Sequence, residues 1–311
     1  MMYEIITLQQ LRDRLNIKST DEDSFLNDLR AVATSIFETE TAKKIIVRSF
    51  TEYHDGRGEN YINTDNYPIY KVTSLYDDAD YEWTSTTEID LTNTLIDYDC
   101  GKITLINEES VFAKSVGNVK VIYQAGYSRF NVVDEVNNYI DVDEGSGEVN
   151  IEIDINSSYD NTGYSADDLA AELESKLNAS SGLSLTYTVT YSYLTQKFTI
   201  SASSTFAIKW DTGASAGKSI GTLMGFNTAS DSSTAASHTS SEAVTGVPGD
   251  IQNAALQIAF MLYEMSKKGQ GIQMLRKKIV GGQSMGTYEY ITDQLPPIAQ
   301  KTIDRYRRVF L

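Results

Sequence analysis

One helix in the last third of the chain constrains the fold more than any other feature. Residues 251–263 are apolar nearly all round, because Phe260 and Met261 lie outside a continuous apolar stripe. The sequence Val247-Pro248-Gly249-Asp250 before this run is typical of a helix start, and Lys267-Lys268-Gly269 after it is typical of a helix end. We expect such a helix at the centre of a domain core or of an oligomer interface. The stripe has the i, i+3, i+4, i+7 spacing of a buried face and consists of Ile251, Ala254, Ala255, Ile258, Ala259, Leu262 and Tyr263.

Three further helices are predicted from the same kind of pattern. Thr7 is a helix-capping residue, and the apolar positions 8, 11 and 15 after it have helical spacing. Leu295-Pro296-Pro297 predicts a short final helix that ends near Arg308. We expect the first two helices to pack on residues 251–263 as one helical core. The second of them opens at residues 20–23 and has a stripe of Phe25, Leu29, Val32, Ala33, Ile36 and Phe37.

Between these helices the apolar period changes to two, which is typical of strands. Strands are predicted at about residues 43–53, 68–75, 101–106 and 118–123. Pro68 lies at the start of the second strand, where a missing N–H costs little. The sequence therefore predicts a small β-domain after the first two helices.

Residues 129–246 contain enough elements for a domain of their own. Strands are predicted at 139–142, 148–155, 184–193, 197–203 and 206–210, with a helix at 165–178 and a short second helix at 219–226. A Ser/Thr/Ala tract at 228–245 is typical of a flexible linker that returns the chain to its main domain. We therefore predict an α+β fold with a helical core and a small β-domain in one discontinuous domain, residues 1–128 and 247–311. Residues 129–246 are predicted to form an inserted small α/β domain.

The charge of the chain is acidic and unevenly distributed. The formal net charge is −17, which argues against a general nucleic-acid binder. From Lys267 onward, nine cations stand against three anions, so this tail carries about +6 and the rest of the chain about −23. The tail is either a solvated basic helix end or a basic arm that docks on an acidic neighbour. The single Cys100 cannot form an internal disulfide, and we expect neither a secretion signal nor a transmembrane span.

Two segments resemble ligand-binding loops but have the wrong spacing. The glycines Gly213 and Gly217 are separated by three residues, whereas a phosphate-binding P-loop has four. Asp141, Asp143 and Glu152 match part of a calcium loop, yet glycine and serine occupy its fifth and sixth positions. A polar loop and an acidic β-turn are the favoured interpretations.

The remaining reactive residue types are isolated. His54, His238 and Cys100 lie in three separate segments without metal-ligand spacing. The carboxylates at positions 77, 78, 80 and 82 are typical of a solvated acidic loop. We therefore expect no enzymatic activity, no cofactor and no metal site, and an enzyme such as a nuclease or hydrolase lacks candidate residues.

Several short motifs follow one another in a recognisable order. The first group is Tyr53-x-Asp55-Gly56, Tyr67-Pro68-Ile69 and Tyr123-x-Ala125-Gly126-Tyr127. The second group is Val247-Pro248-x-Asp250, the basic residues 276–278, Gly282-x-Ser284-x-x-Thr287-Tyr288, Leu295-Pro296-Pro297 and Tyr306-Arg307. In this order the chain resembles the head–tail adaptor (connector, head-completion) family of tailed bacteriophages, which dock as a ring beneath the portal. Members of that family pass almost directly from the Ala-Gly-Tyr strand to the Val-Pro-x-Asp helix, so residues 129–246 depart from the family pattern.

The resemblance implies a structural virion protein located in the neck, and in the host cytoplasm during assembly. It implies a cyclic homo-oligomer, commonly a dodecamer, whose partners are the portal protein and a head-closure (stopper) or tail-completion protein. Genomic DNA would pass through the ring during packaging and ejection without sequence-specific binding. An acidic bore suits this passage, since carboxylates and phosphates repel one another over a Debye length of about 8–10 Å. No membrane partner is expected.

The same resemblance assigns roles to residues of the basic tail. Arginine and tyrosine are effective interface anchors, and the last helix would hold the portal through Arg305, Tyr306, Arg307, Arg308 and Phe310. Arg276, Lys277 and Lys278 would line an interface or the channel. The insert would point outward and contact capsid or decoration proteins. The alternative from another class is a phage surface or tail module that recognises a carbohydrate or host surface through the tyrosines of the insert.

Overall fold

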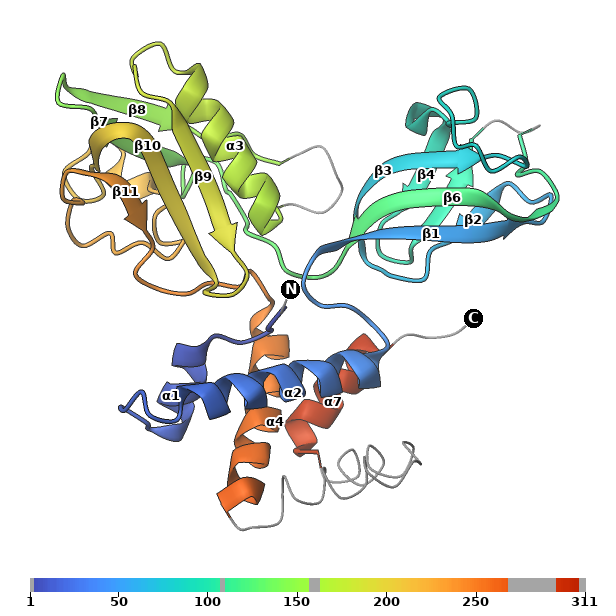
Figure 1. The fold of residues 1–311 in the computed structure, drawn as a ribbon, viewed down its shortest axis with the longest axis horizontal. Coiled ribbons are helices and arrows are strands. Elements are labelled where there is room, and N and C mark those ends of the chain that lie inside the picture. Colours follow the sequence, from blue (N-terminus) through green and yellow to red (C-terminus); the bar gives the residue numbers. More distant parts are fainter. Residues whose placement is uncertain (1–2, 107–109, 157–162, 268–294, 308–311) are drawn as a thin grey trace.

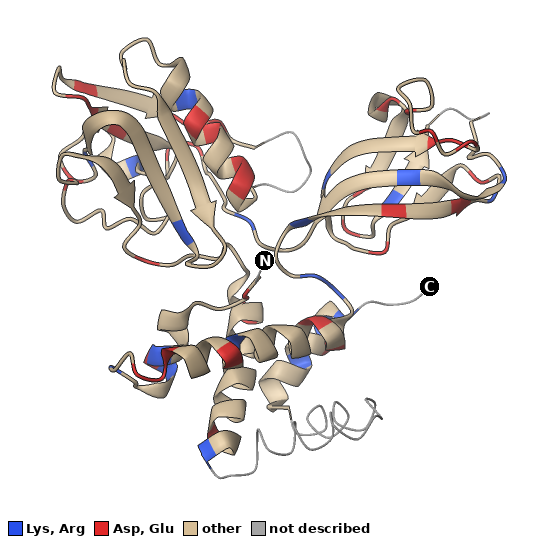
Figure 2. Cartoon of the chain, viewed as in Figure 1, with Lys and Arg blue, Asp and Glu red and all other residues tan. Residues whose placement is uncertain are grey.

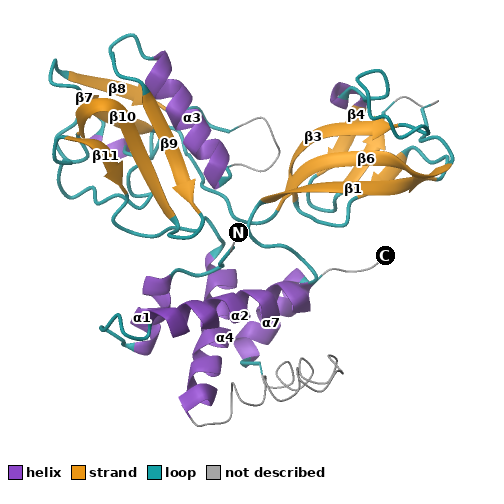
Figure 3. Cartoon of the chain, in the orientation of Figure 1, coloured by secondary structure: helices purple, strands orange, loops and turns teal. Residues whose placement is uncertain are grey.

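The computed structural model describes residues 3–106, 110–156, 163–267 and 295–307, which form three lobes (Figure 1). The helical lobe contains α1, α2, α4 and α7, the β lobe covers residues 48–125, and the insert lobe covers residues 130–244. Acidic side chains are spread over all three lobes (Figure 2). Within the described residues, the helical lobe alone has no strands (Figure 3). The predicted α+β class is confirmed, whereas the proposed domain limits stay a prediction.

Helix α4 (Gly249–Lys267) lies at the centre of the helical lobe. It packs against α1 (Leu8–Leu15), α2 (Asp23–Thr41) and α7 (Pro297–Tyr306), and apolar residues of all these helices share one core. Every residue of the predicted stripe is buried. Phe260, outside the stripe, is 37% exposed and lies beside the Arg14 guanidinium. The stripe therefore marks the faces of α4 that the other helices cover.

Local signals set the ends of these helices. Thr7 and Gln10 form a capping box, in which Thr7 Oγ1 accepts from the Gln10 N–H at 3.1 Å and Gln10 Oε1 accepts from the Thr7 N–H at 2.8 Å. Asn16 ends α1 in the left-handed region, with φ 55°. Pro296 and Pro297 begin α7, where an N–H has no partner within the helix.

The β lobe consists of two small antiparallel sheets that share one core. The first has the strand order β1-β6-β3 and the second has the order β2-β5-β4. Ile62 and Ile103 of the second sheet join Val121 and Tyr123 of the first in the core. The sequence did not predict β2 and β4, because both are short and their side chains are largely half-buried or exposed. The elements are β1 (Arg48–Gly56), β2 (Tyr61–Asn63), β3 (Ile69–Asp77), the 3-10 helix η1 (Leu91–Asn93), β4 (Thr94–Asp97), β5 (Lys102–Leu105) and β6 (Ser115–Ala125).

Glu52 of β1 is a carboxylate surrounded by hydrogen-bond donors. Its Oε2 accepts from the Asp65 N–H at 2.9 Å and lies 3.2 Å from His54 Nε2. Its Oε1 accepts from Asn66 Nδ2 at 2.9 Å and from the Tyr123 hydroxyl. Burial by itself would raise the pKa of Glu52, but the hydrogen bonds from its neighbours outweigh burial and lower this pKa to about 2.

We predict that Glu52 stabilises the fold at neutral pH and ceases to do so as the pH falls from 4.5 to about 2. The direction of this pH dependence follows from the lowered pKa. A carboxyl that is more acidic in the folded than in the unfolded chain stabilises the fold when it is ionised. Thermal melting of the wild type and of Glu52→Gln across this range measures the effect, and the difference between their melting temperatures should shrink. The control is Glu59→Gln, at an exposed position of the same lobe. A difference for Glu52→Gln that is independent of pH would contradict the prediction.

The insert lobe is an antiparallel sheet with one helix packed on it. The strand order is β11-β10-β7-β8, and β9 pairs with β10. Ser165 caps α3 by accepting from the Asp168 N–H at 3.1 Å, and Leu169, Leu173 and Leu177 of α3 are fully buried. The elements are β7 (Tyr139–Asp143), β8 (Glu148–Glu152), α3 (Ala166–Ala179), β9 (Tyr187–Ser192), β10 (Lys197–Ile208), the 3-10 helix η2 (Ala216–Lys218) and β11 (Ala235–Thr239).

Two element predictions in the insert lobe were wrong. The strands predicted at 197–203 and 206–210 are one strand, β10, whose register shifts between Ser201 and Phe206 without a turn. The helix predicted at 219–226 is a run of turns. Gly221 and Gly225 disfavour a helix there, and Gly225 adopts a φ of 80°.

The prediction of a flexible linker at 228–245 was wrong at residues 235–239, which form strand β11. Thr239 and Ser237 hydroxyls lie 2.9 and 3.0 Å from those of their cross-strand partners on β10. The His238 ring packs edge-to-face on Phe206 at 4.6 Å between centroids. A Ser/Thr tract can therefore form a sheet edge when a strand with matching hydroxyls lies beside it.

The insert lobe joins the helical lobe through the turn between β9 and β10. Arg30 of α2 is buried there and donates to Gln196 Oε1 at 2.7 Å, to Ile6 O at 2.9 Å and to Asn27 Oδ1 at 2.6 Å. Gln196 in turn donates to Glu4 O at 2.9 Å. A buried polar network therefore connects the N-terminal segment, α2 and the insert.

Candidate functional site

The residues assigned to portal docking lie at the end of the described chain. Arg305 and Tyr306 belong to the last turn of α7, and Arg307 follows the helix directly. Five other predicted residues lie outside the described residues, namely Arg308, Phe310, Arg276, Lys277 and Lys278.

Asp250, in the first turn of α4, holds this end of α7. Arg305 Nη1 lies 3.1 Å from Asp250 Oδ2, and the Tyr306 hydroxyl donates to the same oxygen at 3.0 Å. A carboxylate in the first turn also interacts favourably with the helix dipole. One side chain thus ties the start of the central helix to the end of the last one.

Tyr306 also contacts the segment that leads out of the β lobe. Its ring packs edge-to-face on Tyr127, with centroids 5.1 Å apart. Lys43 Nζ donates to the Tyr127 hydroxyl at 2.8 Å and lies 4.1 Å from the Tyr67 ring centroid. Burial raises the pKa of both Tyr127 and Tyr306, and the Asp250 carboxylate adds to the effect on Tyr306, so both phenols remain neutral.

Arg307 reaches the end of α2. Its Nε donates to Glu40 O at 3.2 Å, its Nη2 lies 3.5 Å from Glu40 Oε2, and its Nη1 lies 3.4 Å from Asp304 Oδ1. The side chains of Arg305 and Arg307 are 71% and 48% exposed, so each ion pair contributes at most about 1 kcal/mol. Both guanidinium groups are therefore accessible to a further partner.

We call Arg305, Tyr306, Arg307, Asp250 and Tyr127 the C-terminal site. It combines two exposed guanidinium groups with two neutral phenols on a base of packed helices. Guanidinium groups bind carboxylates with paired, directional hydrogen bonds, and tyrosine adds apolar contact area. This set of groups is suited to binding an acidic protein surface.

Sequence reasoning named the basic residues of this site but missed their partners. Asp250 was assigned only to a helix start, Tyr127 only to a strand end, and Lys43 to no site. A signal was present, because Asp250, Tyr127 and Tyr306 all belong to the motifs that carry the family resemblance.

The other candidate loops have structural explanations. The Asp141 carboxylate accepts from the Ser215 N–H at 2.7 Å and from Asn150 Nδ2 at 2.5 Å. The Asp78 carboxylate accepts from the Trp83 N–H at 2.7 Å. In the part of the chain that the structure describes, no cluster of three or more His, Cys, Asp or Glu side chains could hold a metal ion. The described helices include none long and apolar enough to cross a membrane.

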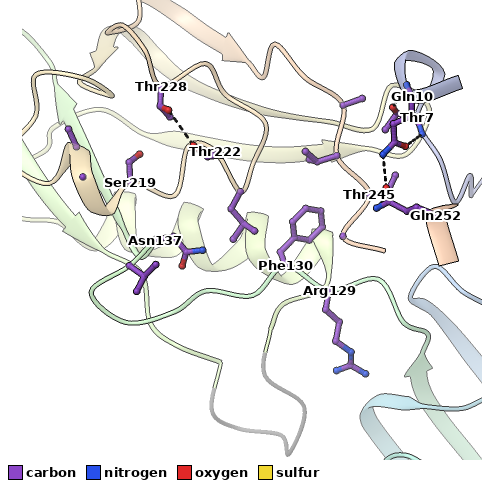
Figure 4. A pocket seen from close by; sticks show the side chains of 17 residues that line it. Thr7, Gln10, Arg129, Phe130, Asn137, Ser219, Thr222, Thr228, Thr245 and Gln252 are labelled. Carbon is purple, nitrogen blue, oxygen red and sulfur yellow. Dashed lines mark hydrogen bonds between the residues drawn. The ribbon is translucent and has the colours of Figure 1, made fainter. Parts of the chain in front are cut away.

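A pocket of about 620 Å³ lies between the insert lobe and the helical lobe (Figure 4). Gln252 Nε2 donates to Thr245 Oγ1 at 3.2 Å, and Gln10 Nε2 donates to Gln252 Oε1 at 2.5 Å. Arg129 is the charged residue of the lining, but its guanidinium lies 4.9 Å from the Tyr70 ring of the β lobe. Several polar side chains of the wall, namely Gln10, Thr245 and Gln252, already bond with one another, so we interpret the pocket as a gap between lobes.

Three tyrosines of the insert, at positions 187, 191 and 193, make contacts within the protein. Tyr187 is buried, the Tyr191 hydroxyl donates to Val244 O at 2.5 Å, and the Tyr193 hydroxyl donates to Asp167 Oδ2 at 3.0 Å. These contacts leave little ring surface for stacking on a sugar.

Comparison with known proteins yields a weak structural likeness. No family model matches the chain, and no curated protein matches it. Among solved structures, the chain is similar to one from the neck of an empty GTA particle, computed with C6 symmetry, with 22% identity and a TM-score of 0.32. The match covers 40% of this chain and 66% of that chain, just under two thirds of its length. A likeness of this degree carries no functional argument.

Proposed function

We propose that the chain is a structural virion protein, a head–tail adaptor that forms a ring below the portal and extends the DNA channel. The order of the sequence motifs supports this proposal, and one structural observation carries it. The C-terminal site places Arg305, Tyr306 and Arg307 where the start of α4, the end of α2 and the segment after the β lobe meet. A partner that binds there contacts a point fixed by three separate parts of the chain.

The proposed partners are the portal protein on one side of the ring and a head-closure or tail-completion protein on the other. The ring is proposed to be a dodecamer that works in the virion neck without catalysis, and the insert is proposed to face capsid or decoration proteins. The acidic side chains on every lobe support a passive channel, because they disfavour binding of DNA phosphates along the bore (Figure 2).

Portal binding by variants of the C-terminal site tests the proposal. Replacing both Arg305 and Arg307 with alanine should weaken binding to purified portal at least about 30-fold, since a central interface anchor contributes about 2 kcal/mol. Lys301→Ala, at an exposed position of the same helix, should change the affinity less than about threefold. Surface immobilisation of the portal gives the affinities, and melting temperatures show whether the variants fold.

Equal affinities for the wild type and the Arg305/Arg307 variant would contradict the docking role of this site. A chain that forms a stable trimer and does not bind the portal would favour the alternative, a module that recognises a carbohydrate or host surface.

A further inference from the structure

Four aromatic side chains gather in the β lobe, where Tyr53 of β1 and Tyr76 of β3 meet the loop that follows β3. The Trp83 ring lies 5.6 Å from Tyr53, 6.3 Å from Tyr76 and 6.0 Å from Tyr81, measured between ring centroids. Tyr53 is 57% exposed and Tyr81 is 51% exposed. We call Tyr53, Tyr76, Tyr81 and Trp83 the aromatic patch. Large rings that cluster together and remain exposed are typical of an interaction surface.

The loop that carries two of these rings is held in one conformation. The buried Asp78 carboxylate accepts from the Asp80 N–H at 2.9 Å and from the Trp83 N–H at 2.7 Å, and the Tyr81 hydroxyl donates to Val116 O at 2.6 Å. Tyr81 and Trp83 adopt φ values of 61° and 53°, in the left-handed region where bulky residues are uncommon. Glycine would close the same loop with less strain. Tyrosine and tryptophan at these two positions therefore raise the conformational energy of the loop relative to glycine.

The patch has the chemistry of a cation-binding surface. Lys120 Nζ already lies 5.3 Å from the ring centroids of both Tyr76 and Trp83. Asp80 and Glu82 are exposed on the same loop and add negative charge beside the rings. Tyrosine and tryptophan faces attract guanidinium and ammonium groups, and nearby carboxylates strengthen that attraction. A basic polypeptide segment fits this surface best.

We propose that the aromatic patch of one copy binds the basic segment 276–278 of a second copy. Arg276, Lys277 and Lys278 are adjacent, and no acidic residue occurs between Lys267 and Lys278, whereas the chain as a whole is acidic. The contact joins two different surfaces of identical chains, and such heterologous contacts close into rings. The inference rests on the proposed ring and names a contact that holds neighbouring subunits together.

A charge-exchange experiment with full-length chains tests the contact. The patch variant carries Asp80→Lys and Glu82→Lys, and the segment variant carries Arg276→Glu, Lys277→Glu and Lys278→Glu. Ring assembly on purified portal is followed by light scattering. Each variant alone should need at least about a tenfold higher concentration to assemble, since like charges then meet at the contact. An equal mixture should assemble within about threefold of the wild type, because opposite charges then meet at every contact in an alternating ring.

The control is a variant with Glu59→Lys and Asp211→Lys, which has the same charge change as the patch variant at exposed positions outside the patch. It should assemble like the wild type. Removing the exposed rings with Tyr53→Ser and Tyr81→Ser should reproduce the defect of the patch variant.

The outcomes separate this contact from the proposed function. A wild type that forms a ring while the charge variants assemble normally overturns the contact and leaves the adaptor proposal standing. Two defective variants whose mixture stays defective also overturn it, since the segment then does not bind the patch of another copy. A wild type that never assembles on the portal contradicts the adaptor proposal itself.

Discussion

Ile258→Ala is expected to destabilise the helical lobe by about 2–5 kcal/mol. Ile258 is fully buried in the stripe of α4, and α4 is the helix on which the others of this lobe pack. Alanine removes apolar contacts and leaves a cavity that surrounding helices cannot fill completely. Since the helical lobe holds four of the five described α-helices, far-UV circular dichroism during denaturation reports mainly on this lobe.

The matched control is Phe260→Ala, two residues further along the same helix. Its larger side chain is 37% exposed and has the Arg14 guanidinium over its ring, so its loss should cost less than about 1.5 kcal/mol. If burial in the shared core determines the loss of stability, Ile258→Ala lowers the free energy of unfolding more than Phe260→Ala does, although isoleucine is the smaller side chain. Equal losses for the two variants would contradict a central position of α4.

Arg30→Ala is expected to cost about 3–5 kcal/mol and to loosen the insert lobe from the helical lobe. Arg30 is only 4% exposed, and its guanidinium supplies donors to Gln196 Oε1 and Ile6 O. Alanine leaves both acceptors buried without that donor. Glu4 loses its charge partner as well, because burial raises the pKa of Glu4 and Arg30 opposes that rise.

Two measurements separate the stability effect from the change in lobe arrangement. Denaturation gives the free energy of unfolding, and small-angle scattering gives the radius of gyration, which should increase in Arg30→Ala. Arg57→Ala, at an exposed arginine of the β lobe, should change neither. An Arg30→Ala protein with the wild-type radius and stability would show that the network does not hold the insert in place.

The parts of the fold that follow from local sequence were predictable. The stripe of α4, the Thr7 capping box and the Ser165 cap each depend on residues within a few positions of one another. The alternating residues of β9 likewise predicted a strand.

Other parts depend on neighbours that a local pattern does not contain. The tract at 228–245 is polar and resembles a linker, yet its residues 235–239 form strand β11 because β10 offers matching Ser and Thr hydroxyls. Strand β10 pairs with β9 at residues 197–202, with β11 at residues 199–201 and Phe206, and with β7 at Ala207 and Ile208, so its length depends on three other strands. Short edge strands such as β2 leave almost no periodic signal.

The candidate site likewise has parts that follow from local sequence and parts that depend on distant residues. The basic residues of the tail were identified from charge and motif order, which are properties of the sequence. Their partner Asp250 is 55 residues from Arg305 in the sequence. The Tyr127 ring that packs on Tyr306 precedes the insert in the sequence, whereas Tyr306 follows it. Contacts of this range require the packed helices that bring the segments together. The aromatic patch was missed for a related reason, since Tyr53 joins Trp83 only when β1 folds beside that loop.

The number of copies that join one portal decides whether the chain forms an adaptor ring. Native mass spectrometry of the full-length chain mixed with purified portal measures this number. We expect one copy per portal subunit in a closed ring. A chain that remains unbound, or that forms a stable trimer with or without portal, would contradict the adaptor function.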